Sequence, residues 1–289
     1  MTLPTETSLD AYADLDTWPL ERSLAALVER NAAAVRAVEA ALPDLERAAA
    51  GLERALRAGG RLVYLGAGTS GRLALQDAAE LPPTFGFTRA VTLLAGGESA
   101  DATAVEGAED DEDEARRRLA AQGLTPDDAV VGVAASGSTP YTVAGTAFAR
   151  AQGAFTVGIA NNPGAPLLEA AEVGVLLSTP PEVLAGSTRL AAGTAQKVAL
   201  NALSTAVLVR LGGAYGNLMV GMRPQNLKLQ ARAARIVAQA TGCTPEEARA
   251  ALSAGGGIRE AIVVLLTGVS ADEARTRLEA SGGRVREAL

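Results

Sequence analysis

The sequence predicts an α/β fold in which a buried parallel sheet is sandwiched by helices. Five short apolar runs recur between residues 62 and 177, and stretches with helical spacing lie between most of them. Short strands that alternate with helices form βαβ units, whose parallel strands are buried on both faces. Ligands of such sheets bind beyond the carboxyl ends of the strands. In this chain the glycine- and hydroxyl-rich segments fall at those ends.

The N-terminal part of the chain precedes the first expected strand. Residues 1–18 are polar and acidic without strong periodicity, and we interpret them as an extended arm. Apolar residues at helical spacing then run from Leu20 to Ala58, and Pro43 predicts a break between two helices. The Gly59-Gly60 pair predicts the end of the second helix.

The remaining elements follow in order. The expected strands span residues 62–65, 91–95, 129–135, 155–160 and 173–177. A long helix is expected from Ser187 to about Leu211, and another at about 225–239. Capping boxes that begin at Thr244 and Ser270 indicate a small helical module at the end of the chain, and we identify no internal repeat. We therefore expect an N-terminal arm with helices (1–54), a sheet domain (55–220) and a C-terminal helical region (221–289).

Composition excludes several classes of function. The 289 residues carry 26 Lys+Arg against 33 Asp+Glu, a net charge of −7, which disfavours nucleic acid or an anionic membrane as the main partner. The chain has no histidine, which excludes histidine-ligated metals and Ser-His-Asp triads. Cys243 is the single cysteine, so neither an intrachain disulfide nor a thiolate metal cluster is expected. Without a signal sequence or an apolar membrane span, we expect a cytoplasmic protein.

A glycine-rich segment follows the first expected strand and opens a helix. Residues 66–72 read Gly-Ala-Gly-Thr-Ser-Gly-Arg, which fits the G-x-G-x-x-G pattern of dinucleotide-binding turns. The pattern alone is weak, because a tight turn also needs glycine. Thr69 and Ser70 at the helix start favour a phosphate monoester, which hydroxyls and free backbone N–H groups bind well. A dinucleotide and a bare turn remain the alternatives.

A second hydroxyl-rich loop and two acidic segments add to this chemistry. Residues 136–140, Ser-Gly-Ser-Thr-Pro, again lie between a strand and a helix, so two such loops suggest a phosphosugar cradle without metal or lysine. Residues 77–85 are expected to end the first helix of the sheet domain, and Glu80 in this segment is an acid near the helix C-terminus, where it opposes the helix dipole. Glu109 begins a run of six acids; most of the run reads as a solvated face, but the small residues Gly107 and Ala108 would let Glu109 turn inward.

Several long motifs in one order resemble the N-acetylmuramic acid 6-phosphate etherases. They occupy residues 66–73, 77–86, 104–110, 134–141, 192–197 and 215–220. The resemblance implies a sugar isomerase (SIS) domain with a flavodoxin-like parallel sheet, a homodimer with sites near the subunit interface, and no metal or nucleotide cofactor. It also implies cleavage of the lactyl ether of N-acetylmuramic acid 6-phosphate, with water, to N-acetylglucosamine 6-phosphate and D-lactate. A related eukaryotic branch contains the glucokinase regulatory protein, which binds phosphosugars.

The resemblance also assigns roles to individual residues. Glu80 corresponds to the proton donor to the lactate oxygen, and Glu109 to the second acid–base residue, which we expect to take the C2 proton. The expected binding residues for the 6-phosphate are Gly68, Thr69, Ser70, Ser136, Ser138 and Thr139. Removal of the C2 proton gives an enolate that expels lactate, and two carboxylates can serve both steps without histidine.

The chain departs from the family pattern at three positions. Ser138 replaces a usual arginine, Ala191 a usual lysine and Gly221 a common aspartate. Arg189 could bind an anionic group of the substrate or pair with surface acids. The alternatives to an etherase are a phosphosugar-binding regulator without catalysis and a phosphosugar isomerase, which uses the same enolate chemistry without a leaving group.

Overall fold

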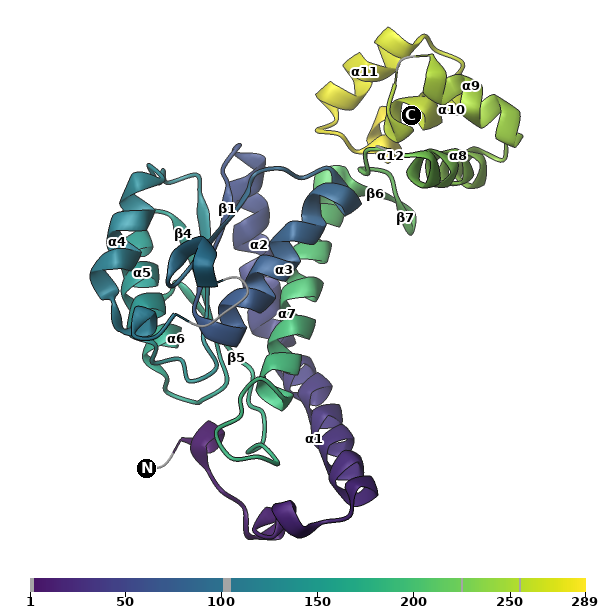
Figure 1. Ribbon diagram of the computed structural model, residues 1–289. Helices are drawn as coiled ribbons and strands as arrows, with labels where there is room; N and C mark the ends of the chain where they lie inside the picture. Colours follow the sequence, from purple (N-terminus) through teal and green to yellow (C-terminus); the bar gives the residue numbers. More distant parts are fainter. Residues whose placement is uncertain (1–2, 101–104, 225, 255) are drawn as a thin grey trace. The chain divides into compact units, whose positions relative to one another are not determined.

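A computed structural model describes residues 3–100, 105–224, 226–254 and 256–289 (Figure 1). The chain divides into two compact units. The first comprises the chain up to Ala78 together with Arg89–Ser204, and the second comprises Ala79–Thr88 together with Thr205–Leu289. The three-part division expected from the sequence stays a prediction.

The first unit is built on a five-stranded parallel sheet, as predicted. Its strands are β1 (Leu62–Gly66), β2 (Ala90–Leu94), β3 (Ala129–Val133), β4 (Phe155–Ala160) and β5 (Val173–Leu176). Their order is β2-β1-β3-β4-β5, and β1 pairs with both β2 and β3. In this order the direction of winding reverses between β1 and β3, where ligands of doubly wound sheets bind.

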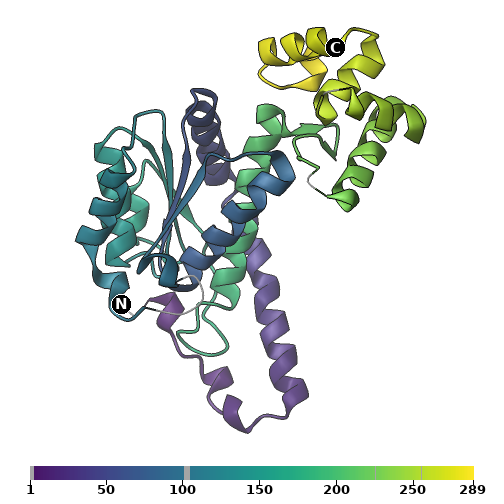
Figure 2. The ribbon, with the colours of Figure 1, turned by 45° about the horizontal axis from the view of Figure 1, so that its top comes forward.

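Helices cover both faces of this sheet (Figures 1 and 2). One side carries α4 (Glu112–Ala121), α5 (Pro140–Ala151) and α6 (Pro166–Ala170), and the other carries α2 (Leu42–Arg57), α3 (Gly68–Phe85) and α7 (Ala191–Leu208). The first helix, α1 (Leu20–Ala40), precedes α2, and the break at Pro43 is confirmed because this residue lies in the first turn of α2. The strand side chains of β1 and β3 are buried throughout, as both faces are covered.

The long helix α7 begins four residues later than the sequence suggested. The buried carboxylate of Glu182 accepts hydrogen bonds from the backbone N–H of Ala191 (3.0 Å) and of Ala192 (2.9 Å). An acid at this position satisfies N–H groups that have no partner within the helix and complements the positive end of the helix dipole. The capping residue lies nine residues before Ala191, which is outside the usual local capping pattern.

The second unit is helical apart from a short hairpin. After α7 come β6 (Ala214–Tyr215) and β7 (Leu218–Met219), then α8 (Leu227–Thr241), α9 (Pro245–Ser253), α10 (Ile258–Thr267), α11 (Ala271–Ala280) and α12 (Val285–Ala288). Val237, Ile262 and Leu278 belong to its hydrophobic core. The predicted capping box at Thr244 is confirmed, and Ser270 accepts a hydrogen bond from the N–H of Glu273.

This unit contains an internal repeat that the sequence analysis missed. Helices α9 and α11 each follow a hydroxyl N-cap and share the sequence Glu-Ala-Arg, at 247–249 and 273–275. Glycines follow each helix in the sequence, and α10 and α12 then share Arg-Glu-Ala from their second residue, at 259–261 and 286–288. The expectation of no repeat is therefore wrong. The second copy is hard to recognise because its last helix is only four residues long.

The described residues contain neither a single membrane-spanning helix nor a cluster of metal ligands. Within residues 3–100, 105–224, 226–254 and 256–289, no single helix has both the length and the hydropathy to cross a membrane; the bent pair α9 and α10 meets that test only when its helices are joined. In the same ranges no group of three or more Cys, Asp or Glu side chains is arranged to hold a metal ion.

Candidate active site

The first hydroxyl loop is a tight turn from β1 into α3 that two glycines make possible. A Cβ added to Gly66 would lie 2.9 Å from the Cα of Gly71, and one added to Gly71 would lie 2.1 Å from the Leu94 side chain. The loop therefore has room only for glycine at both positions. It places Thr69 and Ser70 in the first turn of α3, where backbone N–H groups lack partners within the helix. Such a helix end suits an anionic oxygen.

The carboxylate of Glu109 lies against this loop. Gly68 has φ +52°, and a Cβ built on it would stand 2.9 Å from Oε1 of Glu109. Glu109 lies in a short helical turn, Ala108–Asp110, which follows Gly107 with φ +76°. The structure therefore brings together Glu109, Gly68 and the start of α3. The small neighbours do let the acid approach a candidate site, although its side chain remains exposed.

The second hydroxyl loop lies beside the first. Gly66 and Val133, the last residues of β1 and β3, are paired in the sheet, so the two loops leave it at the same level. The hydroxyl of Ser136 accepts a hydrogen bond from the N–H of Ser138 (3.1 Å) and lies 3.5 Å from the hydroxyl of Thr139. Gly137 has φ +68°, and a Cβ there would lie 2.4 Å from that of Ala165. Ser138 is exposed and Ser136 half-buried.

A buried asparagine fixes this second loop and was not among the predicted site residues. The Asn162 amide donates to the carbonyl oxygen of Ser136 (3.1 Å) and to the hydroxyl of Thr5 (2.9 Å), and its oxygen accepts from the N–H of Thr5 (3.2 Å). The N-terminal arm is thus anchored beside the hydroxyl loop. A useful sequence signal was present, because Asn161-Asn162 directly follows the strand next to β3.

The two acids near the end of α3 have different environments. Asp77 is buried and accepts hydrogen bonds from Tyr64 (2.6 Å), Asn201 (2.6 Å) and Ser204 (3.1 Å), so its carboxylate links β1, α3 and α7. Burial, together with the Asp77 charge, raises the pKa of Tyr64 well above its usual value. Glu80, one turn further along, is exposed. Asp77 is therefore committed to structure, whereas Glu80 is available to a ligand.

The positions where the chain departs from the family pattern do not supply a cation at the loops. Ala191 is fully buried at the start of α7, and Arg189 is exposed just before it.

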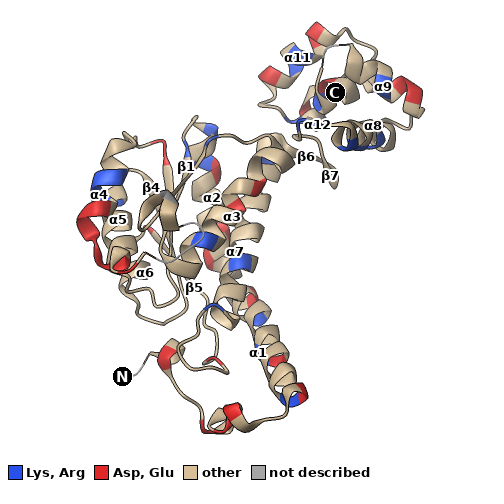
Figure 3. Ribbon diagram, viewed as in Figure 1, with Lys and Arg blue, Asp and Glu red and all other residues tan. Residues whose placement is uncertain are grey.

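The six-acid run lies at the start of α4, where Asp111 caps the helix by accepting a hydrogen bond from the N–H of Glu114 (Figure 3). Arg116 pairs with Glu112 and Asp113, so most of the run is a solvated, self-paired face as predicted.

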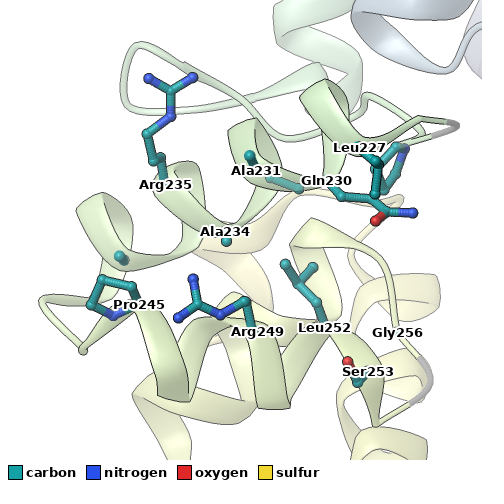
Figure 4. A pocket seen from close by; sticks show the side chains of 13 residues that line it. Leu227, Gln230, Ala231, Ala234, Arg235, Pro245, Arg249, Leu252, Ser253 and Gly256 are labelled. Atoms are coloured by element: carbon teal, nitrogen blue, oxygen red, sulfur yellow. The ribbon is translucent and has the colours of Figure 1, made fainter.

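A separate pocket lies in the second unit, between α8 and α9 (Figure 4). It has a volume of about 790 Å³, and its lining includes Leu227, Ala234, Leu252 and the arginines Arg235 and Arg249. None of the predicted site residues lines it, and its lining contains no carboxylate. It therefore cannot supply the acid–base pair that the sequence points to.

Comparisons with known proteins agree with this geometry. The family model of the glucokinase regulatory protein N-terminal SIS domain matches residues 44–150, and that of the SIS domain matches residues 108–206. The phosphoheptose isomerase of Neisseria gonorrhoeae superposes with a TM-score of 0.50 at 19% identity, covering 65% of this chain and 97% of its own. The predicted SIS fold is confirmed.

Two curated relatives match over most of the chain. The N-acetylmuramic acid 6-phosphate etherase of Deinococcus radiodurans is 56% identical over 257 residues, which is 88% of this chain and 84% of the relative. The protein of the same name from Streptomyces avermitilis is 47% identical over 291 residues, covering 100% of this chain and 94% of the relative.

Proposed function

The chain belongs to the N-acetylmuramic acid 6-phosphate etherase family, and from this premise we propose how its own residues carry out the reaction. The enzyme cleaves the D-lactyl ether of N-acetylmuramic acid 6-phosphate with water and releases N-acetylglucosamine 6-phosphate and D-lactate. The names of the relatives favour this activity over a regulator or an isomerase. We further propose that it acts in the cytoplasm as a homodimer.

Two acids divide the chemistry. In the open-chain sugar, Glu109 takes the proton from C2, which is acidic because the C1 aldehyde stabilises the resulting enolate. The C3–O bond then breaks and Glu80 gives its proton to the departing lactate oxygen. Water adds across the new double bond, with the hydroxyl on C3 and the proton on C2. The hydroxyls and N–H groups of the two loops hold the phosphate throughout.

One observation carries this proposal. The carboxylate of Glu109 lies 2.9 Å from where a Cβ of Gly68 would stand, so an acid is present at the loop that would hold the phosphate. C2 and the 6-phosphate belong to one small molecule. The base that takes the C2 proton must therefore lie close to the phosphate site, as Glu109 would. The one cation of these two segments, Arg72, donates to the carbonyl oxygen of Ala100 (3.2 Å), so we expect phosphate binding to rely on hydroxyls and on the positive end of α3.

D-lactate release by the purified protein tests the assignment. Glu80→Gln and Glu109→Gln keep the shape of each side chain but remove its acid–base function, so each should lower kcat at least about 100-fold. Asp110→Asn is the matched control, because Asp110 is the exposed neighbour of Glu109, and it should retain activity. Full activity in both glutamine variants would rule out these roles.

The family resemblance, which implies sites near the subunit interface of a homodimer, supports a second subunit in each site. Thr69 and Glu80 both lie on α3, but they belong to different compact units of the chain. We therefore propose that each site of the homodimer combines the loops and Glu109 of one subunit with Glu80 of the other.

A further inference from the structure

The repeat of the second unit places two arginines at equivalent positions, and their environments differ. Arg286, in the second copy, is exposed and lies 5.3 Å from the centre of the Tyr215 ring, where a cation–π contact stabilises it. Arg259, in the first copy, is partly buried at the start of α10. The same sequence, Arg-Glu-Ala, thus presents one arginine to an aromatic partner and holds the other inside the unit.

Within the described residues, no hydrogen bond or ion pair engages the Arg259 side chain, and Glu260 acts on it only through its charge. Its Nε is buried without an acceptor, and burial lowers the pKa of its guanidinium. The nearest acid, Glu260, turns its carboxylate toward the backbone, so that Oε2 lies 2.8 Å from where a Cβ of Gly257 would stand. A partly buried guanidinium that lacks hydrogen-bond acceptors is costly, and a bound anion would reduce that cost.

Two glycines let the backbone approach the terminal nitrogens of Arg259 without placing a side chain on them. A Cβ on Gly221 would stand 3.0 Å from Nη2, and one on Gly283 would stand 3.1 Å from Nη1. Gly283 has φ +80°, a conformation that disfavours other residues. A carboxylate at position 221 would neutralise the arginine, whereas glycine supplies no acceptor, so the guanidinium keeps its capacity for a bidentate pair with an oxyanion.

The same glycine connects Arg259 with the end of α3. A Cβ on Gly221 would stand 2.3 Å from the carbonyl oxygen of Phe85, the last residue of that helix. Glu80 precedes Phe85 by five residues, or about 7 Å of helix, and both belong to the second unit. The proposed proton donor and the unpaired arginine therefore lie in one small body.

We propose that Arg259 binds the carboxylate of the substrate's lactyl group and is a specificity-determining residue. The inference rests on the proposed function, because Glu80 protonates the oxygen that departs with that group. The lactyl carboxylate is the second anionic group of the substrate, and the hydroxyl loops serve only the first. A planar guanidinium matches a carboxylate better than a point charge does.

Steady-state kinetics of Arg259→Gln test this inference, with Arg286→Gln as the matched control from the other repeat. Loss of a charge-assisted pair should raise KM for N-acetylmuramic acid 6-phosphate at least about tenfold while kcat changes much less. Arg259→Lys should lie between, because it keeps the charge without the bidentate geometry. An unchanged KM in folded Arg259→Gln, or an equal rise in Arg286→Gln, would overturn the inference.

Calorimetry with small ligands separates this inference from the proposed function. D-lactate at millimolar concentration should bind the wild type and Arg286→Gln. D-lactamide should give no binding signal with the wild type, and D-lactate should give none with Arg259→Gln. Phosphate binding that depends on Arg259 while D-lactate does not bind would overturn the carboxylate assignment. If the wild type releases no D-lactate from the substrate but binds D-lactate through Arg259, the proposed function fails and the anion site stands.

Discussion

At the scale of single residues, the site depends on glycines that bring charged and backbone groups close together. Gly68 has a positive φ and lies beside the carboxylate of Glu109. Gly137 also has a positive φ, and it packs tightly against Ala165. Any other residue at Gly68 would meet both backbone strain and the acid. The spacing of the glycines could be read from the sequence, but which of them faces Glu109 could not.

Gly68→Ala should therefore impair catalysis more than folding. We expect kcat/KM to fall at least about tenfold, because the new methyl group displaces the Glu109 carboxylate. Gly164→Ala is the control, since Gly164 has φ +69° with nothing within 4 Å of its added Cβ. Both variants should lose about 1 kcal/mol of stability from the positive φ. Equal activity in the two would show that Glu109 does not act beside Gly68.

At the scale of elements, the sequence predicted the strands well because each is a short apolar run with turn residues at its end. It failed where a partner lies far away along the chain. The start of α7 depends on Glu182, and the second hydroxyl loop depends on a contact between Asn162 and Thr5, which are 157 residues apart. Local patterns contain no information about such pairs.

An ion pair joins the starts of β1 and β3. Asp128 accepts from the backbone N–H of Arg61 (2.7 Å), from its guanidinium (2.7 Å) and from the N–H of Thr125 (2.9 Å). Burial would raise the pKa of Asp128, but these hydrogen bonds outweigh it and lower the pKa to about 2. Since the folded pKa is depressed, the stabilisation is complete above the unfolded value of about 4 and is lost as the pH falls through about 2.

Asp128→Asn should consequently destabilise the protein in a pH-dependent way. Thermal unfolding at neutral pH should show a loss of at least about 1 kcal/mol relative to the wild type. The difference should shrink as the pH falls from about 4 toward about 2, because the wild-type carboxylate becomes protonated there. A gap that stays constant over this range would mean that the charge of Asp128 contributes nothing.

If the protein is the homodimer that we propose, the exposed face of α1 is a candidate surface for its subunit contact. Leu20, Leu24 and Val28 recur every four residues along one side of the helix and are 75%, 54% and 71% exposed. Such a stripe on a helix usually packs against another surface. Val28→Asp should shift the protein from dimer to monomer in light scattering and lower activity with it. Glu29→Gln, an exposed neighbour, should do neither; a Val28→Asp protein that remains dimeric would exclude this face.

At the scale of the whole molecule, the chain combines a SIS sheet with a repeated helical module, and the proposed function adds a second subunit. The sheet and the two hydroxyl loops could be predicted because their signals are local and repeated. The repeat was missed because its second copy ends in a four-residue helix. The expected role of Glu80 came from the family resemblance, as did the expectation of a site near the subunit interface.

Mixing two inactive variants tests this central claim most directly. If each site combines Glu109 of one subunit with Glu80 of the other, a heterodimer of Glu80→Gln with Glu109→Gln contains one intact site. Co-expression in equal amounts should then restore D-lactate release to about a quarter of the wild-type rate, because half of the dimers are mixed and each has one working site of two. A mixture that stays as inactive as either variant alone, with mixed dimers shown to form, would contradict the account.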